Sequence, residues 1–294
     1  MTLSAAVSDG ATSSASLDPP KTRKVVVMAR HGERRDYVDQ AAGKNWIPTA
    51  SRPWDPPLSE HGVEQSRRMG QAIRQTLKEL GLPPISVVYS SPLQRCRQTA
   101  AAAIGSLVDE DTQDSFAVRV EEGLTESANA AWYGSWCLPG ADSTWGYRPK
   151  RPDGSTMHLH QIDMHALHDA AKKPVQDILE DWTTLSGTDD SSLKDMDISY
   201  ESISKLPAPY CWGHFETRKD QRERMYKTID LVAKKGESII CISHGGPITH
   251  LYERLTGNDW TAHGESSYTC FSIYVQDEGG PWNPIVVNDS KHLS

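Results

Sequence analysis

The hydrophobic positions of this chain fall into short runs that end at turns or at charged residues. Residues 25–28 are all apolar and lead into an Arg-His-Gly turn at 30–32. Residues 238–243 form a second, largely apolar run, bounded by serines. Runs of this length that end at a glycine turn are typical of buried strands in a parallel sheet. Further strands are predicted at 85–89, 116–120 and 268–275, with a short edge strand at 285–287.

Helical patterns lie between these strands. Ser59 is suited to cap a helix with a rough apolar face, which Gly81 ends. Residues 35–58, which are rich in proline and contain two tryptophans, are predicted to form a long loop. Three more helices are predicted, one beginning near Pro92, one over about 216–235, and one from the turn after His244 to about Gly257.

Two segments depart from this alternation. Residues 1–22 are mostly Ser, Ala, Asp, Gly and Pro and are expected to be a disordered leader. Residues 129–213 are expected to be an insertion that covers the functional site of a domain spanning 23–294. Its aromatic residues either line an apolar pocket or form a small core of the insertion. Its histidines are compatible with a metal site, although solvated side chains are favoured: His158, His160, His165 and His168.

Charge and composition narrow the range of partners. The net charge is -8 and the pI is about 5.8, which disfavours nucleic acids and anionic membranes as partners. No apolar run approaches the ~18 residues of a membrane span, and no secretory signal precedes the first strand. Five cysteines without a CxxC pair predict reduced thiols, and Cys96 is interpreted as a core residue. We therefore expect a cytoplasmic protein, with the nucleus also compatible, whose anion site is a local cluster of arginines.

Histidines follow two of the predicted strands in the same way. His31 and His244 each stand just after an apolar run and just before a glycine. Arg95 lies at the start of the helix that follows a third strand, and Glu126 follows a fourth. If these strands are neighbours in a parallel sheet, their carboxyl ends bring all four side chains to one edge.

This set of side chains is complete for phosphoryl transfer. Guanidinium groups bind phosphate oxygens and stay charged. A histidine among them is kept neutral and nucleophilic by like charge, and a carboxylic acid can protonate the leaving alkoxide. Arginines can replace a metal ion as the charge clamp. We therefore expect that no metal is needed.

The motifs also carry a family resemblance. The stretches concerned are 30–34 (RHGER), 43–46 (GKNW), 55–59 (DPPLS), 91–96 (SPLQRC), 119–126 (RVEEGLTE) and 243–245 (SHG). In their order and spacing they resemble the histidine phosphatase superfamily, also called phosphoglycerate-mutase-like. Within it they are most similar to the phosphatase domains of the T-cell signalling suppressors. The resemblance covers about residues 24–127 and 216–275.

The resemblance implies a three-layer α/β/α sandwich with a mainly parallel sheet and no cofactor. The implied reaction is metal-independent hydrolysis of a phosphomonoester through a phosphohistidine. Arg30 is implied both as a catalytic residue and as a phosphate ligand. The remaining implied roles are His31 as the nucleophile, Arg34 and Arg95 as phosphate ligands, His244 as a donor to the phosphate, and Glu126 as general acid and then base.

Some positions depart from that pattern. Thr125 and Ser127 flank Glu126 where those relatives commonly carry aromatic residues, so the resemblance does not extend to the fit of the substrate. Glu121 and Glu122 are interpreted as structural. Two alternative functions remain, namely a phosphomutase of the same fold and a weakly active phosphate-binding module with a regulatory or scaffold role. The expected substrate is a phosphorylated small molecule or a phosphopeptide, and the sequence does not predict the oligomeric state.

Overall fold

The computed structural model describes residues 23–44, 56–108, 116–126, 194–197, 199–204 and 217–294. The predicted leader and most of the predicted insertion, with its histidines and all of its aromatic residues except Tyr200, lie outside the described residues. Within the described part of the chain, no helix combines the length and the apolar character needed to cross a bilayer.

The centre of the structure is a six-stranded sheet with the strand order β3-β2-β4-β1-β5-β6. Its strands are β1 (Lys24–Arg30), β2 (Ile85–Ser90), β3 (Val118–Val120), β4 (Ser238–Ser243), β5 (Phe271–Gln276) and β6 (Trp282–Asp289). The first four strands run parallel to one another, whereas β5 is antiparallel to β1 and β6 is antiparallel to β5. The predicted mainly parallel sheet is confirmed.

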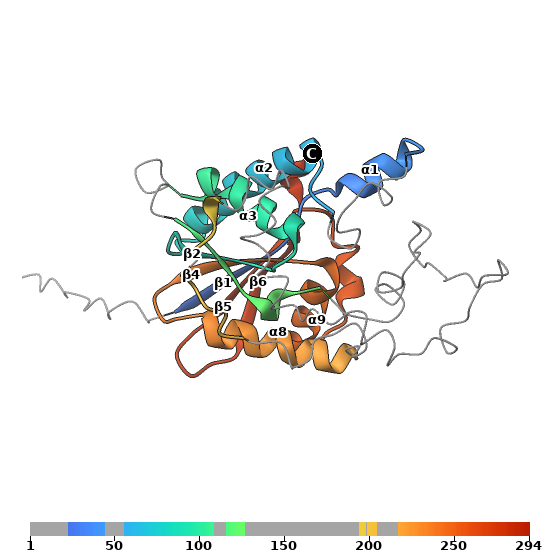
Figure 1. Ribbon diagram of the computed structural model, residues 1–294. Coiled ribbons are helices and arrows are strands. Elements are labelled where there is room, and N and C mark those ends of the chain that lie inside the picture. Colours follow the sequence, from blue (N-terminus) through green and yellow to red (C-terminus); the bar gives the residue numbers. More distant parts are fainter. Residues whose placement is uncertain (1–22, 45–55, 109–115, 127–193, 198, 205–216) are drawn as a thin grey trace, which may run out of the picture.

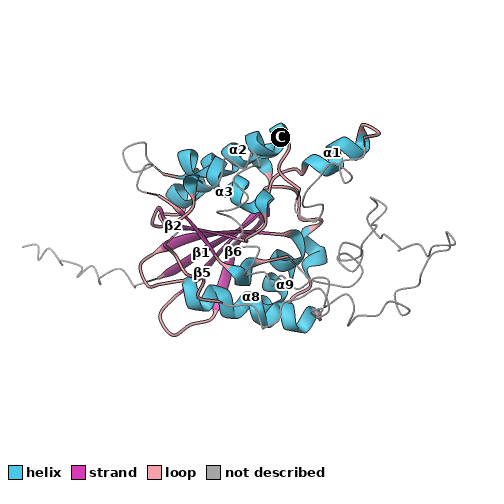
Figure 2. Ribbon diagram, viewed as in Figure 1, coloured by secondary structure: helices cyan, strands magenta, loops and turns pink. Residues whose placement is uncertain are grey.

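Helices cover both faces of this sheet (Figures 1 and 2). The helices are α1 (Arg35–Ala41), α2 (Glu60–Glu79), α3 (Gln94–Leu107), α8 (Arg218–Val232) and α9 (Gly245–Thr256), with the short 3-10 helices η2 (Glu122–Leu124), η5 (Trp260–His263) and η6 (Lys291–Leu293). In Figure 1, α2 and α3 lie on one face, and α8 and α9 lie on the other. The architecture is therefore the predicted three-layer α/β/α sandwich.

Strand β1 shows why the layers form. Val25 and Val27 belong to the core cluster that contains residues of α2 and α3, whereas Val26 and Met28 belong to the cluster that contains residues of α8 and α9. All four side chains are fully buried. Successive side chains of a strand point to opposite faces, so an uninterrupted apolar run requires a hydrophobic layer on each side.

The predicted helix ends are largely confirmed. The side chain of Ser59 accepts a hydrogen bond from the amide of Gly62 at the start of α2, and Gly81 follows the helix with φ +63°. Gly257 ends α9 in the left-handed conformation. Helix α3 differs from the prediction, because it begins at Gln94 after Leu93 as its N-cap, so Pro92 precedes the helix.

The predicted long loop at 35–58 is wrong in its first part, where α1 forms. The buried residues of α1 are Asp36 and Asp39. Asp36 pairs with Arg34, and Asp39 pairs with the first residue of the helix. Charge pairs rather than an apolar face stabilise this helix, and hydrophobic periodicity therefore gave no signal for it.

The last predicted strand begins later than expected. Strand β5 starts at Phe271 and not at residue 268. Thr269 has φ 54°, which interrupts extended backbone, and its amide donates to the carbonyl of His31 at 3.2 Å. The predicted short edge at 285–287 is part of the longer strand β6.

Candidate active site

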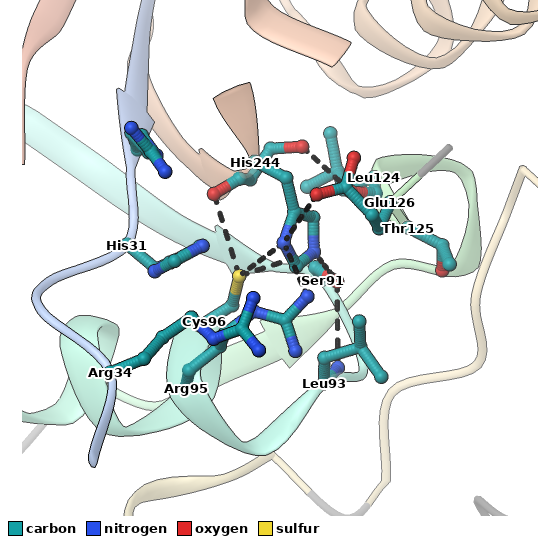
Figure 3. A network of polar contacts seen from close by, with 12 residues as sticks. His31, Arg34, Ser91, Leu93, Arg95, Cys96, Leu124, Thr125, Glu126 and His244 are labelled. Atoms are coloured by element: carbon teal, nitrogen blue, oxygen red, sulfur yellow. Dashed lines mark hydrogen bonds and ion pairs between the residues drawn. The ribbon is translucent and has the colours of Figure 1, made fainter. Parts of the chain in front are cut away.

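The carboxyl ends of the four parallel strands carry the predicted site residues. The two histidine-bearing strands, β1 and β4, are direct neighbours, with Arg30 opposite Ser243. The pairing continues one residue further, because the amide of His31 donates to the carbonyl of Ser243 at 3.0 Å. The ring centroids of His31 and His244 consequently lie 5.3 Å apart, and Figure 3 shows the ring of His244 between the ring of His31 and the side chain of Glu126.

The ring of His31 is held by the backbone. Its side chain is buried, and Nδ1 lies 2.8 Å from the carbonyl oxygen of Gly32. A carbonyl can only accept, so Nδ1 carries the hydrogen and Nε2 carries the lone pair. The pKa of His31 lies well below its usual value, first because of burial and next because of Arg95 and Arg30. The imidazole is therefore neutral at neutral pH.

The ring of His244 is held by side chains at both nitrogens (Figure 3). It is fully buried, with Nε2 2.8 Å from Ser91 Oγ and Nδ1 3.1 Å from Arg95 Nη2. A guanidinium can only donate, so Nδ1 is the acceptor and Nε2–H donates to Ser91. Burial and then Arg95 lower the pKa of His244 well below its usual value. Cys96, interpreted from the sequence as core, is fully buried, and its Sγ also lies 3.4 Å from Nε2 of His244.

Two of the three predicted phosphate ligands lie close to these rings. Arg95 is in the first turn of α3 and is almost completely buried. Arg30 ends β1, donates to the carbonyl of Ser266, and lies over the ring of Tyr268 at 4.5 Å. The same Tyr268 ring lies 5.8 Å from the ring of His31. These contacts place two cations and one aromatic ring around His31.

Arg34, the third predicted phosphate ligand, already binds a carboxylate. Its Nε and Nη2 donate to the two carboxylate oxygens of Asp36 at 3.0 and 2.6 Å, and both side chains are buried. Its guanidinium also lies over the ring of Tyr37 at 4.3 Å. Arg34 is near enough to contribute to the lowered pKa of His31. One edge of its fork is nevertheless directed at Asp36.

The predicted acid Glu126 follows η2, is 6% exposed, and has one carboxylate oxygen 3.6 Å from Nδ1 of His244. The prediction that Glu121 is structural is confirmed. Its fully buried carboxylate accepts hydrogen bonds from Tyr200, Ser202, and the amides of Ile203 and Ser204. This carboxylate therefore joins the residues after β3 to the segment 199–204.

Sequence reasoning missed three side chains of this region. Ser91 and Asp36 each bind one of the predicted site residues, and Tyr268 contacts two of them. Ser91 had an available signal, because it ends a parallel strand as the predicted residues do. Tyr268 had none, since it lies just before an antiparallel strand.

No metal centre is evident in the part of the chain that the structure describes. There, no three His, Cys, Asp or Glu side chains gather in a way that would hold a metal ion. The histidines discussed above as a possible metal site lie outside this part.

Known sequences match part of this chain. A sequence profile described as "histidine phosphatase superfamily (branch 1)" matches residues 26–154. The human ubiquitin-associated and SH3 domain-containing protein A is 35% identical over an alignment of 130 residues, which covers 35% of this chain and 18% of that protein. This chain thus spans less than a fifth of the length of that curated relative.

A solved phosphatase structure shares the fold. The ecdysone phosphate phosphatase of Bombix mori, in complex with tungstate, superposes with a TM-score of 0.52 at 18% identity, covering 91% of this chain and 93% of that chain. A mycobacterial glucosyl-3-phosphoglycerate phosphatase superposes with a TM-score of 0.46 at 18% identity, covering 91% of this chain and 100% of that chain.

The profile match and the sheet topology agree with the chemistry at the strand ends. By fold, the described part of the chain is an α/β/α sandwich of the kind found in a solved phosphatase structure. Within the chain, residues 26–154 are similar to the histidine phosphatase superfamily.

Proposed function

We propose that this chain is a metal-independent phosphomonoesterase that works through a phosphohistidine on His31. The observation that carries the proposal is the state of this ring. Nδ1 is bonded to the carbonyl of Gly32, and burial among arginines lowers the pKa, so Nε2 offers a lone pair at neutral pH. An unprotonated imidazole nitrogen beside two guanidinium groups is suited to attack phosphorus.

The first step transfers the phosphoryl group to the protein. Nε2 of His31 attacks the phosphorus atom as the bond from phosphorus to the ester oxygen breaks. Arg30 and Arg95 neutralise the charge on the equatorial oxygens. The Glu126 carboxylic acid gives its proton to the leaving oxygen, which departs as an alcohol. No metal ion is required, because the arginines supply the positive charge.

The second step hydrolyses the phosphohistidine and regenerates free His31. The Glu126 carboxylate takes a proton from water, whose oxygen attacks phosphorus as the bond from phosphorus to Nε2 breaks. Phosphate leaves, and His31 is again neutral. The proposed role of His244 is to exchange its Nε2–H bond to Ser91 for a bond to the phosphate in the transition state. Arg34 contributes positive charge beside Asp36.

The proposed substrate is a phosphorylated small molecule or a phosphopeptide. The ecdysone phosphate phosphatase shares the fold of this chain, and its name indicates that the neighbour acts on a small phosphoester. The buried phosphate-binding side chains and the negative net charge of this chain are compatible with a small or apolar ester.

The test is to follow the phosphate. The purified chain should release inorganic phosphate from p-nitrophenyl phosphate at the same rate with and without EDTA. With 32P-labelled substrate, a quench in alkaline detergent should capture label on the protein that is stable to alkali and lost in acid, as phosphohistidine is. His31→Asn should abolish both turnover and label. Turnover that persists in this variant would overturn the proposal.

The same assay separates the alternatives. Transfer of the label to a second metabolite rather than to water would identify a phosphomutase, which the proposal excludes. Phosphate binding without release above the buffer rate would identify a binding module with a regulatory or scaffold role.

A further inference from the structure

An arginine on helix α8 binds the backbone of the segment that carries Glu126. Arg224, on α8, donates from Nη1 to the carbonyl oxygens of Gly123 at 2.6 Å and Thr125 at 3.0 Å. Its Nη2 lies 3.5 Å from the carbonyl oxygen of Glu126 itself. One planar guanidinium therefore spans three carbonyls of four consecutive residues.

The beginning of this segment is fixed independently. The hydroxyl of Ser243 at the end of β4 donates to the carbonyl of Leu124 at 2.7 Å. A Cβ on Gly123 would lie 2.1 Å from Thr228 Oγ1 and 2.4 Å from Ser204 Oγ, so the backbone is in close contact with both neighbours there. Beyond Leu124, the hydrogen bonds of Arg224 reach the carbonyl groups of Thr125 and of Glu126 itself.

Helix α8 is itself a rigid support. A capping box formed by Thr217 and Asp220 begins it. Met225, beside Arg224 in the sequence, is fully buried in the core, and Thr228 Oγ1 donates to the carbonyl of Arg224 at 2.8 Å. The guanidinium consequently extends from a helix whose position is set by packing.

We propose that Arg224 is a positioning residue that sets the place of the Glu126 carboxylate relative to the leaving oxygen. The proposal rests on the function proposed above, because it requires Glu126 to be the acid. Arginine suits this task, since its rigid fork binds several carbonyls at fixed angles, whereas the ammonium group of lysine does not. A shift of about 1 Å in a catalytic group can lower a rate by roughly 10²-fold.

The test compares leaving groups. An alkyl phosphate needs a proton on its departing oxygen, whereas p-nitrophenolate leaves well without one. Arg224→Ala should lower kcat/KM, which reports the transfer of the phosphoryl group to His31, by about tenfold or more for an alkyl phosphate such as glycerol phosphate and by less than about twofold for p-nitrophenyl phosphate. Arg224→Lys keeps the charge and should show the same selective loss to a smaller extent.

Arg222 provides the matched control. It lies on the same helix and pairs with Glu253 on α9. Arg222→Ala removes an arginine and an ion pair of the same helix without touching the segment 123–126. It should leave both rates at the wild-type level, and thermal melting should report any general loss of stability in each variant.

The double variant separates this proposal from the one on which it rests. In a Glu126→Gln background, Arg224→Ala should cause no further selective loss, because both changes act on the same proton transfer. If Glu126→Gln alone shows no dependence on the leaving group, the proposed acid fails. If it does and the Arg224 variants do not, only the positioning role fails. Equal loss on both substrates, or additive effects in the double variant, also overturns the positioning role. Should Arg224→Ala not fold, Arg224→Lys decides in the same way.

Discussion

His31 and His244 occupy equivalent places in the sheet and are held in opposite ways. Each follows a parallel strand and precedes a glycine, and their strands are neighbours with Arg30 opposite Ser243. The ring of His31 is bound at Nδ1 by the backbone carbonyl of Gly32. The ring of His244 is bound at both nitrogens by side chains, one from the turn after β2 and one from the first turn of α3.

This difference gives the two rings different chemistry. A backbone carbonyl at Nδ1 leaves the other nitrogen of His31 with its lone pair, which suits a nucleophile. Ser91 and Arg95 use both nitrogens of His244, so this ring can act on a substrate only by exchanging one of those bonds. Two nearly identical sequence motifs therefore support two roles, and the partners of each ring decide which one it takes.

The largest expected effect comes from replacing each histidine by asparagine. His31→Asn should lower kcat for p-nitrophenyl phosphate by about 10⁴-fold or more, because nothing replaces a missing nucleophile. His244→Asn should lower it by roughly 10²-fold, as expected for one donor to the transition state. Steady-state kinetics measures both, with circular dichroism as the folding control. Equal losses would remove the distinction between the rings.

Ser91→Ala tests the side-chain support of His244. Without this hydroxyl, the ring of His244 is less well oriented before the substrate binds, and kcat should fall by about tenfold, as expected for a misplaced donor to the transition state. The NMR signal of the Nε2–H of His244 should shift or vanish. The control is Ser90→Ala, because the adjacent Ser90 is equally buried but donates to a backbone carbonyl. If the two variants behave alike, Ser91 has no particular role at His244.

The part of the site that depends on strand ends could be predicted from the sequence. An apolar run followed by a glycine turn indicates both a buried strand and its carboxyl end, and parallel strands bring those ends together. His31, His244, Arg95 and Glu126 were predicted on this basis, and the structure places them side by side. The same runs predicted hydrophobic layers on both faces of the sheet.

The partners of the rings could not be predicted in this way. Ser91 and His244 are 153 positions apart in the sequence, and no periodic pattern marks such a contact. The pairing of Arg34 with Asp36 was missed for a different reason. The pair lies at the start of a helix, α1, that has no apolar face, so the segment resembles a loop in the sequence. Contacts made by polar side chains thus remained hidden where the hydrophobic pattern was uninformative.

Asp36→Asn tests how far Asp36 offsets the positive charge of Arg34 near His31. The expected effect is smaller than those above. The carboxylate of Asp36 occupies one edge of the Arg34 fork, and its charge opposes an arriving anion. Its neutral analogue should strengthen competitive inhibition by inorganic phosphate by about three- to tenfold. Asp39→Asn is the control, since Asp39 pairs with Arg35 on the same helix. Weaker inhibition in Asp36→Asn would mean that Asp36 orients Arg34 for phosphate instead of competing with it.

The smallest expected effect concerns stability, where the two rings should behave alike. Burial and arginines lower the pKa of both histidines in the folded state. As the pH falls through about 6.5, these two histidines therefore bind protons in the unfolded chain before they do so in the folded chain. The free energy of unfolding that the two neutral rings contribute at higher pH is then lost. The Tm should decrease by a few degrees between about pH 7.5 and about pH 5.5. His31→Gln and His244→Gln should each flatten this dependence by a similar amount, whereas His61→Gln, at an exposed position of α2, should not. A slope that only His244→Gln changes would show that His31 is protonated in the folded state, which contradicts its proposed role as a neutral nucleophile.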